Sequence, residues 1–343
     1  MRLATGAGYW SAGPPEGALE SLLEAEKLGY ESFWTAEAYG SDALTPLAWW
    51  GASTSTIKLG TSIVQLSART PAATAMAAMT LDHLSGGRFV LGLGVSGPQV
   101  VEGWYGEPYA RPLARTREYV EIVRAILARE QPVEHQGEFY SLPFRGGTGL
   151  GKPLRSTVHP LRRDLPIYLG AEGPKNVALA AEICDGWLPL FFSPKDEVNR
   201  YYEACLDEGF GRPGARGKRQ DFEVVCPVSV VPIDDIGRAA DVMRPHLALY
   251  VGGMGARGAN FHFEVFARMG YEEQCIKIQQ LYLEGRKREA EALVTLEMVE
   301  DVALVGPREK IRDDLQRWEA SCVTTLLVSG PPTVLRLMAE LCA

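Results

Sequence analysis

The stretch IKLGTSIVQLSARTPAATAMAAMTLDHLSGGRFVLGLGVSG at residues 57–97 decides how this chain folds. Its two ends are short apolar runs, and we expect strands at 58–64 and 88–94. Between them, residues 71–84 favour a helix that begins with a proline, where the missing N–H group costs little. A strand, a helix and a second strand in this order predict a βαβ unit with parallel strands.

The same alternation continues in both directions. Further strands are expected at 3–7, 32–35, 165–170, 186–190, 222–231 and 323–329, with helices at 15–28, 47–53, 111–129, 174–184, 195–208 and 307–320. Eight strands alternating with helices predict an α/β protein with a single (β/α)8 TIM-barrel domain over residues 1–343. Two segments interrupt the alternation. We expect an irregular insertion at 131–164 and a mostly helical insertion at 234–300, before strand eight.

Composition excludes several classes of protein. The formal net charge is -8, which argues against a nucleic-acid partner, because such proteins usually carry a basic face. No apolar run approaches the roughly 20 residues that a membrane span needs. The first residues, MRLATGAGYW, lack the pattern of a secretory signal, and the six cysteines form no CxxC pair. We expect a soluble cytoplasmic protein without a membrane partner.

In a TIM barrel, the loops after the strands carry the site. Here they are polar but largely uncharged and rich in glycine, which suits a planar ligand that lies against backbone. The turn LGAEGPKN at 169–176 ends a strand in small residues and starts a helix at Pro174. The free N–H groups of that helix predict a phosphate site, to which Lys175 and Asn176 could add contacts.

Other ligand motifs are absent or out of place. The string LGLGVSG at 91–97 contains G-x-G-x-x-G, but it follows strand four and no helix opens inside it, so a Rossmann or P-loop site has no support. The five histidines are isolated, without HxH or HExxH spacing, and we expect no metal site.

Five stretches of the chain together resemble a known family, the luciferase-like hydride transferases. This family includes bacterial luciferase, alkanesulfonate monooxygenase and the deazaflavin (coenzyme F420) dehydrogenases and reductases. The stretches that carry the resemblance are EKLGYESFWTAEAYGSD (26–42), residues 57–106, PLARTREYVEIVRAIL (112–127), PIYLGAEGPKNVALAAEICDGWLP (166–189) and VTTLLVSG (323–330). They cover nearly the whole chain, and they look most similar to the actinobacterial F420-dependent branch.

The resemblance implies where a cofactor would lie. It implies a cis peptide bond between Ser62 and Ile63, in a bulge that backs the isoalloxazine or deazaflavin ring. The flanks of the ring or of the ribityl chain would be Gly94, Val95 and Ser96. The ribityl hydroxyls and the phosphate would be held by Gly170, Ala171, Glu172, Gly173, Pro174, Lys175 and Asn176. A substrate pocket would include Trp10, Tyr39, Trp104 and His262.

One departure from the family bears on the reaction. Several deazaflavin dehydrogenases have Asp-His after strand two, with the histidine as base, and this chain has Glu37-Ala38 there. Ala38 cannot take a proton. Glu37 is therefore the candidate general acid or base, or else it bonds the cofactor ring or a neighbouring loop. Without a strong base, reduction of an activated C=C, C=N or C=O bond is favoured over alcohol oxidation.

Coenzyme F420 is the expected cofactor, and a small organic molecule the expected substrate. One alternative is a flavin mononucleotide (FMN) monooxygenase that receives reduced flavin from a separate reductase, and another is a cofactor-binding protein without catalysis. A barrel hydrolase would need two facing carboxylates, for which only Glu37, Asp42 and Glu172 are placed. We also expect a homodimer, with the helices at 74–84 and 111–129 packed across a two-fold axis.

Overall fold

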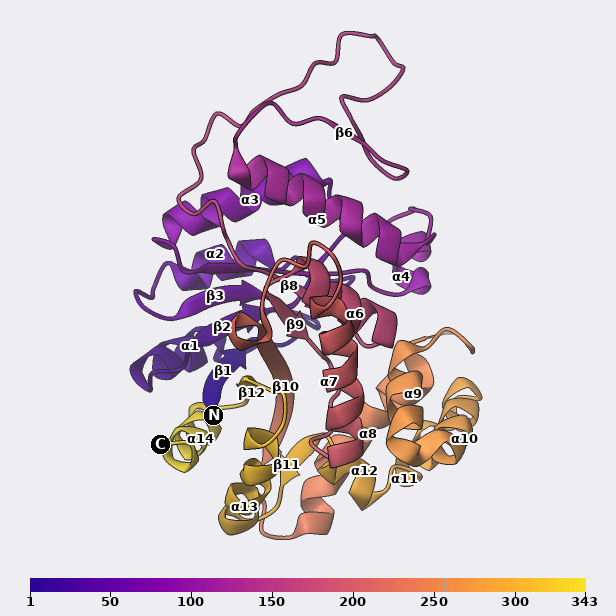
Figure 1. The fold of residues 1–343 in the computed structure, drawn as a ribbon. Coiled ribbons are helices and arrows are strands. Elements are labelled where there is room, and N and C mark those ends of the chain that lie inside the picture. The colour runs from indigo at the N-terminus through magenta and orange to yellow at the C-terminus, as the bar shows by residue number, and fades with distance from the viewer. Residues whose placement is uncertain (256) are drawn as a thin grey trace.

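The predicted (β/α)8 barrel is confirmed by the structure, a computed structural model that describes residues 1–255 and 257–343 (Figure 1). Its eight barrel strands are β1 (Arg2–Gly6), β2 (Ser32–Thr35), β3 (Lys58–Thr61), β5 (Phe89–Gly94), β8 (Ile167–Gly170), β9 (Gly186–Leu188), β10 (Glu223–Val231) and β12 (Thr325–Ser329). All of them pair in parallel, and the sheet closes because β12 pairs with both β1 and β10. The strands are covered on both faces, which explains their nearly continuous apolar sequences.

Helices surround the barrel on its outside. They are α1 (Ala18–Lys27), α2 (Leu44–Gly51), α3 (Pro71–Leu84), α4 (Pro98–Gly103), α5 (Pro112–Ala128), α6 (Pro174–Ile183), α7 (Asp196–Phe210), α13 (Arg308–Glu319) and α14 (Pro332–Leu341). The start of α3 shows how the sequence sets such a boundary. Thr70 accepts a hydrogen bond from the Ala73 N–H group at 3.2 Å, and Pro71 follows it as the first helical residue. None of the described helices is long and apolar enough to cross a membrane.

The inside of the barrel has a core of its own. The side chains that fill it are Ala4, Trp34, Val90, Tyr168, Leu188, Val225 and Leu327, with Ile63 packed against them. The Trp34 and Tyr168 rings lie 5.8 Å apart, and glycines make room for them, because a Cβ at Gly60 would overlap the Trp34 ring. At the carboxyl ends of the strands, the corresponding positions include Gly6, Gly94 and Gly170. Bulky side chains therefore plug the lower barrel, whereas small residues line its upper opening.

The structure corrects several predicted boundaries. The strand expected at 58–64 ends at Thr61, before the cis Ser62–Ile63 peptide bond. The chain continues as a separate strand, β4 (Val64–Gln65), which pairs with β5. The helix expected at 15–28 begins only at Ala18. The helix expected at 47–53 is α2, which begins three residues earlier than predicted, at Leu44. Helix α14, after the last strand, was not predicted.

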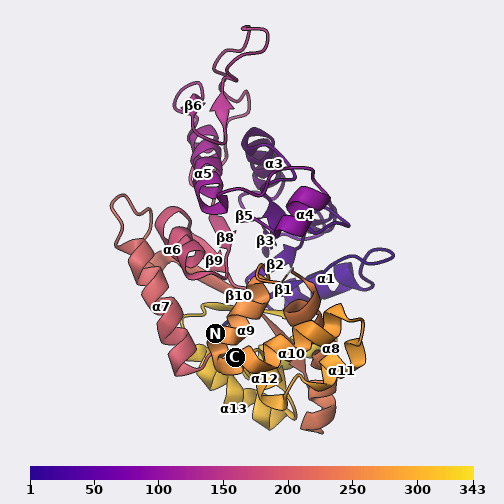
Figure 2. The ribbon, with the colours of Figure 1, turned by 90° about the vertical axis from the view of Figure 1, so that its right-hand side faces the viewer.

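The segment 131–164 leaves the body of the barrel. It holds a small antiparallel pair, β6 (His135–Gln136) and β7 (Ser141–Leu142), and projects beyond α5 in both views (Figures 1 and 2). The rest of the segment is irregular, as its glycine and proline content predicts.

The segment 234–300 is mostly helical, and residue 256 within it lies outside the described residues. Its elements are α8 (Ile236–Gly253), α9 (Phe261–Phe266), the π-helical turn η2 (Ala267–Tyr271), α10 (Glu272–Leu283), α11 (Lys287–Ala292) and α12 (Leu296–Glu300), which gather on one side of the barrel (Figure 2). A short strand that was not predicted, β11 (Ala303–Val305), then pairs with the end of β10. A short helical turn, η1 (Arg219–Asp221), precedes β10. The division into one domain with two insertions stays a prediction.

A buried ion pair fastens the helical segment to the barrel. Lys195, at the start of α7, lies 2.9 Å from the buried carboxylate of Asp301, to which the Tyr271 hydroxyl also donates at 2.6 Å. Lys195 also reaches Glu297 of α12 at 3.1 Å. Because α7 follows β9, these contacts hold the helical segment beside the carboxyl ends of β8 and β9.

Candidate active site

A floor of small residues lies at the carboxyl ends of β5 and β8. The Ser62–Ile63 peptide bond is cis, as the family resemblance implied. The Ile63 side chain packs over two glycines: a Cβ at Gly94 would lie 2.7 Å from Ile63 Cδ1, and one at Gly170 would lie 3.0 Å from Ile63 Cγ2. Any larger residue would displace Ile63. The arrangement forms a floor of backbone and one aliphatic side chain, against which the ring of a flat ligand could lie.

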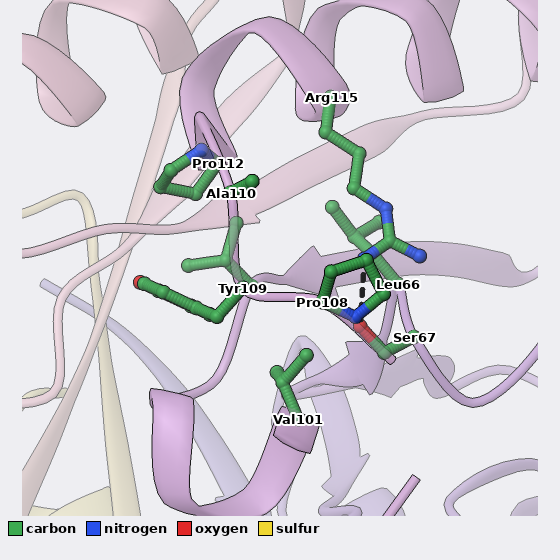
Figure 3. Close-up of a pocket in the computed structure, with 9 residues that line it drawn as sticks. Leu66, Ser67, Val101, Pro108, Tyr109, Ala110, Pro112 and Arg115 are labelled. Atoms are coloured by element: carbon green, nitrogen blue, oxygen red, sulfur yellow. Dashed lines mark hydrogen bonds between the residues drawn. The ribbon is translucent and has the colours of Figure 1, made fainter. Parts of the chain in front are cut away.

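The loop after β5 continues this floor. Val95 is half-buried, and Ser96 has a left-handed backbone with a φ of 59°, which lets the chain turn into α4 at Pro98. Val95 also borders a narrow pocket beneath α5 (Figure 3), whose other lining residues are Leu66, Ser67, Val101, Pro108, Tyr109, Ala110, Pro112 and Arg115. Arg115 donates to Ser67 Oγ at 3.2 Å and closes the pocket from above. Its volume of about 10 Å³ holds roughly one water, not a cofactor.

The turn between β8 and α6 carries unused polar groups. Gly173 directly precedes α6 in extended conformation, and Pro174, which has no N–H group, is the first helical residue. The N–H groups of Asn176 and Val177 both donate to the Gly173 carbonyl at 3.0 Å, which leaves those of Gly173 and Lys175 without a partner among the described residues and free for a ligand. One buried oxygen, Asn176 Oδ1, has no hydrogen-bond partner among the described residues. Glu172 Oε2 makes no hydrogen bond of good geometry, although it lies 2.9 Å from His262 Nδ1. Buried acceptors without a partner are costly, and ligand hydroxyl groups would satisfy them. Ala171, in the same turn, is buried and accepts from the Trp187 indole N–H at 2.7 Å.

Lys175 points elsewhere. It is exposed and lines a surface cavity of about 320 Å³ between α5, α6 and α7, together with Arg117, Glu208 and Arg212. This cavity lies on the outer side of α6, so the structure separates Lys175 from the unused groups of the turn.

Arg268 of η2 brings a positive charge to that turn, and the sequence reasoning missed it. Its guanidinium donates to the Glu172 carbonyl at 2.9 Å and to the Tyr202 hydroxyl at 3.2 Å, both of which are neutral acceptors. Its buried Nε–H group has no partner in the described part of the chain. No motif marks Arg268 in the sequence, because the helical segment brings it to the turn only in the folded chain.

Glu37 is held in an ion pair. Its side chain is 2% exposed, and its two oxygens accept from Arg69 at 2.9 and 3.1 Å. The N–H groups of Gln65 and Ala43 donate to it as well, at 3.1 and 3.3 Å. The carboxylate therefore ties the loop after β2 to the bulge after β3, which favours the structural alternative for Glu37 over proton transfer to a substrate.

The three carboxylates considered for a hydrolase are all engaged separately. Glu37 pairs with Arg69, and Asp42 accepts from the N–H groups of Leu44 and Thr45 at the start of α2. Glu172 pairs with His262, as described below. No two of them face each other as an acid and a nucleophile would, so the geometry gives the hydrolase alternative no support.

Aromatic residues surround the opening. Tyr39, after β2, and Trp104, after α4, are both exposed, and their rings lie 6.5 Å apart, so they form one side of the entrance. Trp10, after β1, is half-buried and packs against Trp50 of α2 with ring centres 6.1 Å apart.

The opposite side is an aromatic cluster. Its members are Phe191, His246, Tyr250, His262 and Phe266, from the loop after β9 and from α8 and α9. Ring centres lie 4.7 Å apart for His246 and Tyr250, and 4.9 Å apart for Tyr250 and His262. Burial lowers the pKa of His246, as does the nearby His262, and burial together with Tyr9 raises the pKa of Tyr250. Both groups are therefore neutral near pH 7. Phe191, Tyr250 and Phe266 are buried, so the cluster is a packed aromatic core from which the partly exposed His262 and the exposed His246 reach the surface.

Metal ligands do not converge here. Among residues 1–255 and 257–343, no group of three or more His, Cys, Asp or Glu side chains could hold a metal ion.

Comparisons with known proteins agree with this geometry. A family model described as luciferase-like monooxygenase matches residues 3–325. A Mycobacterium tuberculosis protein with the provisional name coenzyme F420-dependent oxidoreductase is 56% identical over 332 residues, which cover 96% of this chain and 95% of that protein. The 5,10-methylenetetrahydromethanopterin reductase of Archaeoglobus fulgidus is 30% identical over 318 residues, or 90% of this chain and 87% of that protein.

Among solved structures, the coenzyme F420-dependent tetrahydromethanopterin reductase of Methanopyrus kandleri has the same fold. The TM-score is 0.79 at 24% identity, with 99% of this chain and 98% of that chain covered. The resemblance drawn from the sequence is confirmed: the chain belongs to the luciferase-like monooxygenase family, a family of oxidoreductases.

Proposed function

We propose that this chain is a coenzyme F420-dependent oxidoreductase that transfers a hydride between the deazaflavin and a small organic substrate. The observation that carries the proposal is the floor of Ile63, Gly94 and Gly170, where a Cβ at either glycine would press against the Ile63 side chain. It lies beside a turn whose buried Asn176 Oδ1 has no hydrogen-bond partner among the described residues, so a hydroxyl group of a polyol chain could satisfy it. The provisional name of the 56% identical relative supports the same cofactor.

The residues that would hold the cofactor follow from these contacts. Ser62, Ile63, Gly94 and Gly170 would lie under the ring, and Val95 and Ser96 would flank it. The ribityl hydroxyls and the phosphate would meet the turn residues Ala171, Glu172, Gly173, Pro174 and Asn176. We assign the positive contact of the phosphate to Arg268 instead of Lys175, because Lys175 lines the outer cavity.

The bound cofactor would supply the hydride, and this chain would orient the substrate and exclude water. Tyr39, Trp104 and Trp10 would border the substrate on one side, and the aromatic cluster on the other. Because Glu37 is engaged by Arg69 and is not free as a base, reduction of an activated C=C, C=N or C=O bond by the reduced cofactor is favoured over alcohol oxidation. An FMN-dependent monooxygenase is the second candidate, since the family description names that activity. A cytoplasmic location, and the absence of a nucleic-acid partner, stay predictions from the sequence.

The test is a titration of the purified protein with coenzyme F420 and, separately, with FMN, followed by tryptophan fluorescence. We expect tighter binding of F420. Arg268→Gln should weaken that binding about 10- to 100-fold, since a hydrogen bond to a charged group contributes about 1.5–3 kcal/mol. The matched control is Lys175→Gln, which should leave the affinity unchanged because Lys175 faces the outer cavity. Tighter binding of FMN would favour the monooxygenase, and binding of neither would refute both candidates.

We also propose a homodimer, which packs through α3, as the sequence predicts, and through α2 in place of the predicted helix at 111–129, which has no exposed large apolar side chain. Trp49 on α2 is 78% exposed, and Met76 and Leu84 on the adjacent α3 are exposed as well. Such an apolar surface is unusual on a monomer. Trp49→Glu should therefore shift the mass in sedimentation equilibrium from two chains to one, whereas Ile276→Glu, at an exposed position on α10, should not. A wild-type mass of one chain would refute the dimer.

A further inference from the structure

Glu172 and His262 meet across the entrance although 90 positions separate them in the chain. Glu172 belongs to the turn after β8, and His262 to the first turn of α9. His262 Nδ1 lies 3.0 Å from Glu172 Oε1, and the two side chains are 17% and 10% exposed for His262 and Glu172. The pair is thus largely withdrawn from water, and a charge-assisted contact is stronger in such a buried setting than in water.

The backbone around His262 is fixed as well. The buried Asn260 side chain caps α9, because its Oδ1 accepts from the N–H groups of His262 and Phe263 at 3.0 and 3.1 Å. Its Nδ2 group donates to the carbonyls of Tyr250 and Val251 in α8 at 2.9 and 2.8 Å. The imidazole is therefore placed by a rigid junction of two helices, as a group that must meet a reacting atom requires.

The other imidazole nitrogen is available. His262 Nε2 has no hydrogen-bond partner among residues 1–255 and 257–343, and the ring stands edge to face with Phe191 and Tyr250 at 5.8 and 4.9 Å. A carboxylate on Nδ1 selects the form in which Nδ1 carries the proton and stabilises the imidazolium. Nε2 is then the nitrogen that exchanges a proton with a bound molecule.

We propose that His262, positioned by Glu172, is the proton donor of the reaction, and that the substrate is an apolar or aromatic molecule with a C=N or C=O bond. This inference rests on the proposed function. When bound in its reduced form, the deazaflavin would supply the hydride to the substrate carbon and would be oxidised by two electrons. The nitrogen or oxygen receives the proton of His262 Nε2–H, so the imidazolium becomes neutral imidazole with its proton on Nδ1. Water then returns a proton to Nε2, and Glu172 stays a carboxylate throughout.

Other groups near the entrance are less suited to this step. Glu37 is occupied by Arg69, and Ala38 has no titratable group. The hydroxyl of Tyr250 is a weak acid in its buried setting. His246 is exposed, and no side chain among the described residues hydrogen-bonds its imidazole to position it. The histidine that the loop after β2 lacks is thus supplied by α9. The exposed rings of Tyr39 and Trp104 at the entrance account for the expected substrate class, whereas Phe191, Tyr250 and Phe266 are buried and support His262 from behind.

The first test needs no cofactor. Nitrogen-15 NMR of the imidazole groups, recorded at a pH where they are neutral, should show His262 with its proton on Nδ1 in the wild type. Glu172→Ala should lose that preference and give a mixture of both forms, because the acceptor for Nδ1–H is gone. A wild-type His262 with its proton on Nε2, or a Glu172→Ala spectrum that is unchanged, would overturn the assignment.

The second test measures reduction of acetophenone, an aromatic ketone, and 3,4-dihydroisoquinoline, an aromatic imine, by reduced F420. We expect the wild type to reduce at least one, and His262→Ala to lower its kcat on that compound about 10²- to 10⁴-fold. Added imidazole should restore part of the lost rate, which it would not do for a residue that only packs. His83→Gln, at a distant histidine on α3, is the control and should keep the wild-type rate.

The outcomes separate the two proposals. F420 binding by His262→Ala at wild-type affinity, with the rate lost, supports the proton donor. A rate within tenfold of the wild type would overturn it, and so would reduction of neither compound by a wild type that binds F420, because the substrate class would then be wrong. Absence of F420 binding by the wild type is a failure of the proposed function, and the NMR result stands apart from it.

Discussion

Arg69→Met should lower the free energy of unfolding by about 3–5 kcal/mol, the cost of leaving a buried charge without its partner. Glu37 is 2% exposed, and both of its oxygens accept from the Arg69 guanidinium. The remaining donors, the N–H groups of Gln65 and Ala43, are neutral and cannot balance the carboxylate charge. Urea denaturation followed by circular dichroism would measure the difference.

The matched control is an exposed ion pair of the same kind. Arg308 and Glu340 lie 2.7 Å apart with side chains 49% and 62% exposed, so Arg308→Met should cost at most about 1 kcal/mol. The double variant Glu37→Gln with Arg69→Met should be more stable than Arg69→Met alone, since it removes the orphaned charge. Equal stability of Arg69→Met and the wild type would contradict the structural role of the pair.

The same site decides whether Glu37 also takes part in catalysis, which stays a prediction from the sequence. If Glu37 only joins the two loops, Glu37→Gln should keep kcat within about tenfold at a temperature where the variant is folded. A loss of about 10²-fold or more in the folded variant would instead make Glu37 the general acid or base.

Gly92→Ala should cost about 3 kcal/mol or more and weaken cofactor binding at the same time. A Cβ at this position of β5 would overlap the carbonyl oxygen of Thr61 and lie 2.8 Å from Leu188 Cδ1. The two strands cannot simply part, because Thr61 Oγ1 donates to the Gly92 carbonyl and accepts from the Gly92 N–H group, both at 2.9 Å. Thr61 directly precedes the Ser62–Ile63 bulge, so any shift of Thr61 would move the floor of the site.

Gly103→Ala is the control for this substitution. No heavy atom lies within 4 Å of the position of its Cβ, and the backbone there needs no glycine. Its unfolding free energy and its affinity for F420 should match those of the wild type. A Gly92→Ala variant that unfolds at the wild-type urea concentration would show that β3 and β5 are further apart than the structure places them.

Much of the barrel follows from local patterns. Apolar runs of strand length, helices that start at Pro71 and Pro174, and glycines at their ends set the alternation of strands and helices. The boundaries could not be predicted as well, because they depend on tertiary contacts. In the strand expected at 58–64, Ile63 leaves the strand and packs over Gly94 and Gly170, and no local signal reports these contacts. The three-residue strand β11 was missed for the same reason, since only its pairing with β10 defines it.

The floor and the turn could be located from the sequence, since both follow directly from strand ends and a family resemblance. The roles of individual side chains could not. Glu37 lies beside the bulge but is engaged by Arg69, which is 32 positions away in the chain. Lys175 lies on the outer side of its helix. The sequence contains all of these residues but no sign of which way each one faces.

By itself, the sequence determined the barrel, the glycine-lined end of its strands and the family, because these depend on short-range periodicity and on stretches that stay contiguous. Only the tertiary structure decided that Glu172 meets His262 and that Arg268 reaches the turn after β8. Both contacts join the turn after β8 to helices that lie 90 and 96 positions later in the chain. Such contacts depend on how the helical segment packs beside β8 and β9, which no local pattern encodes.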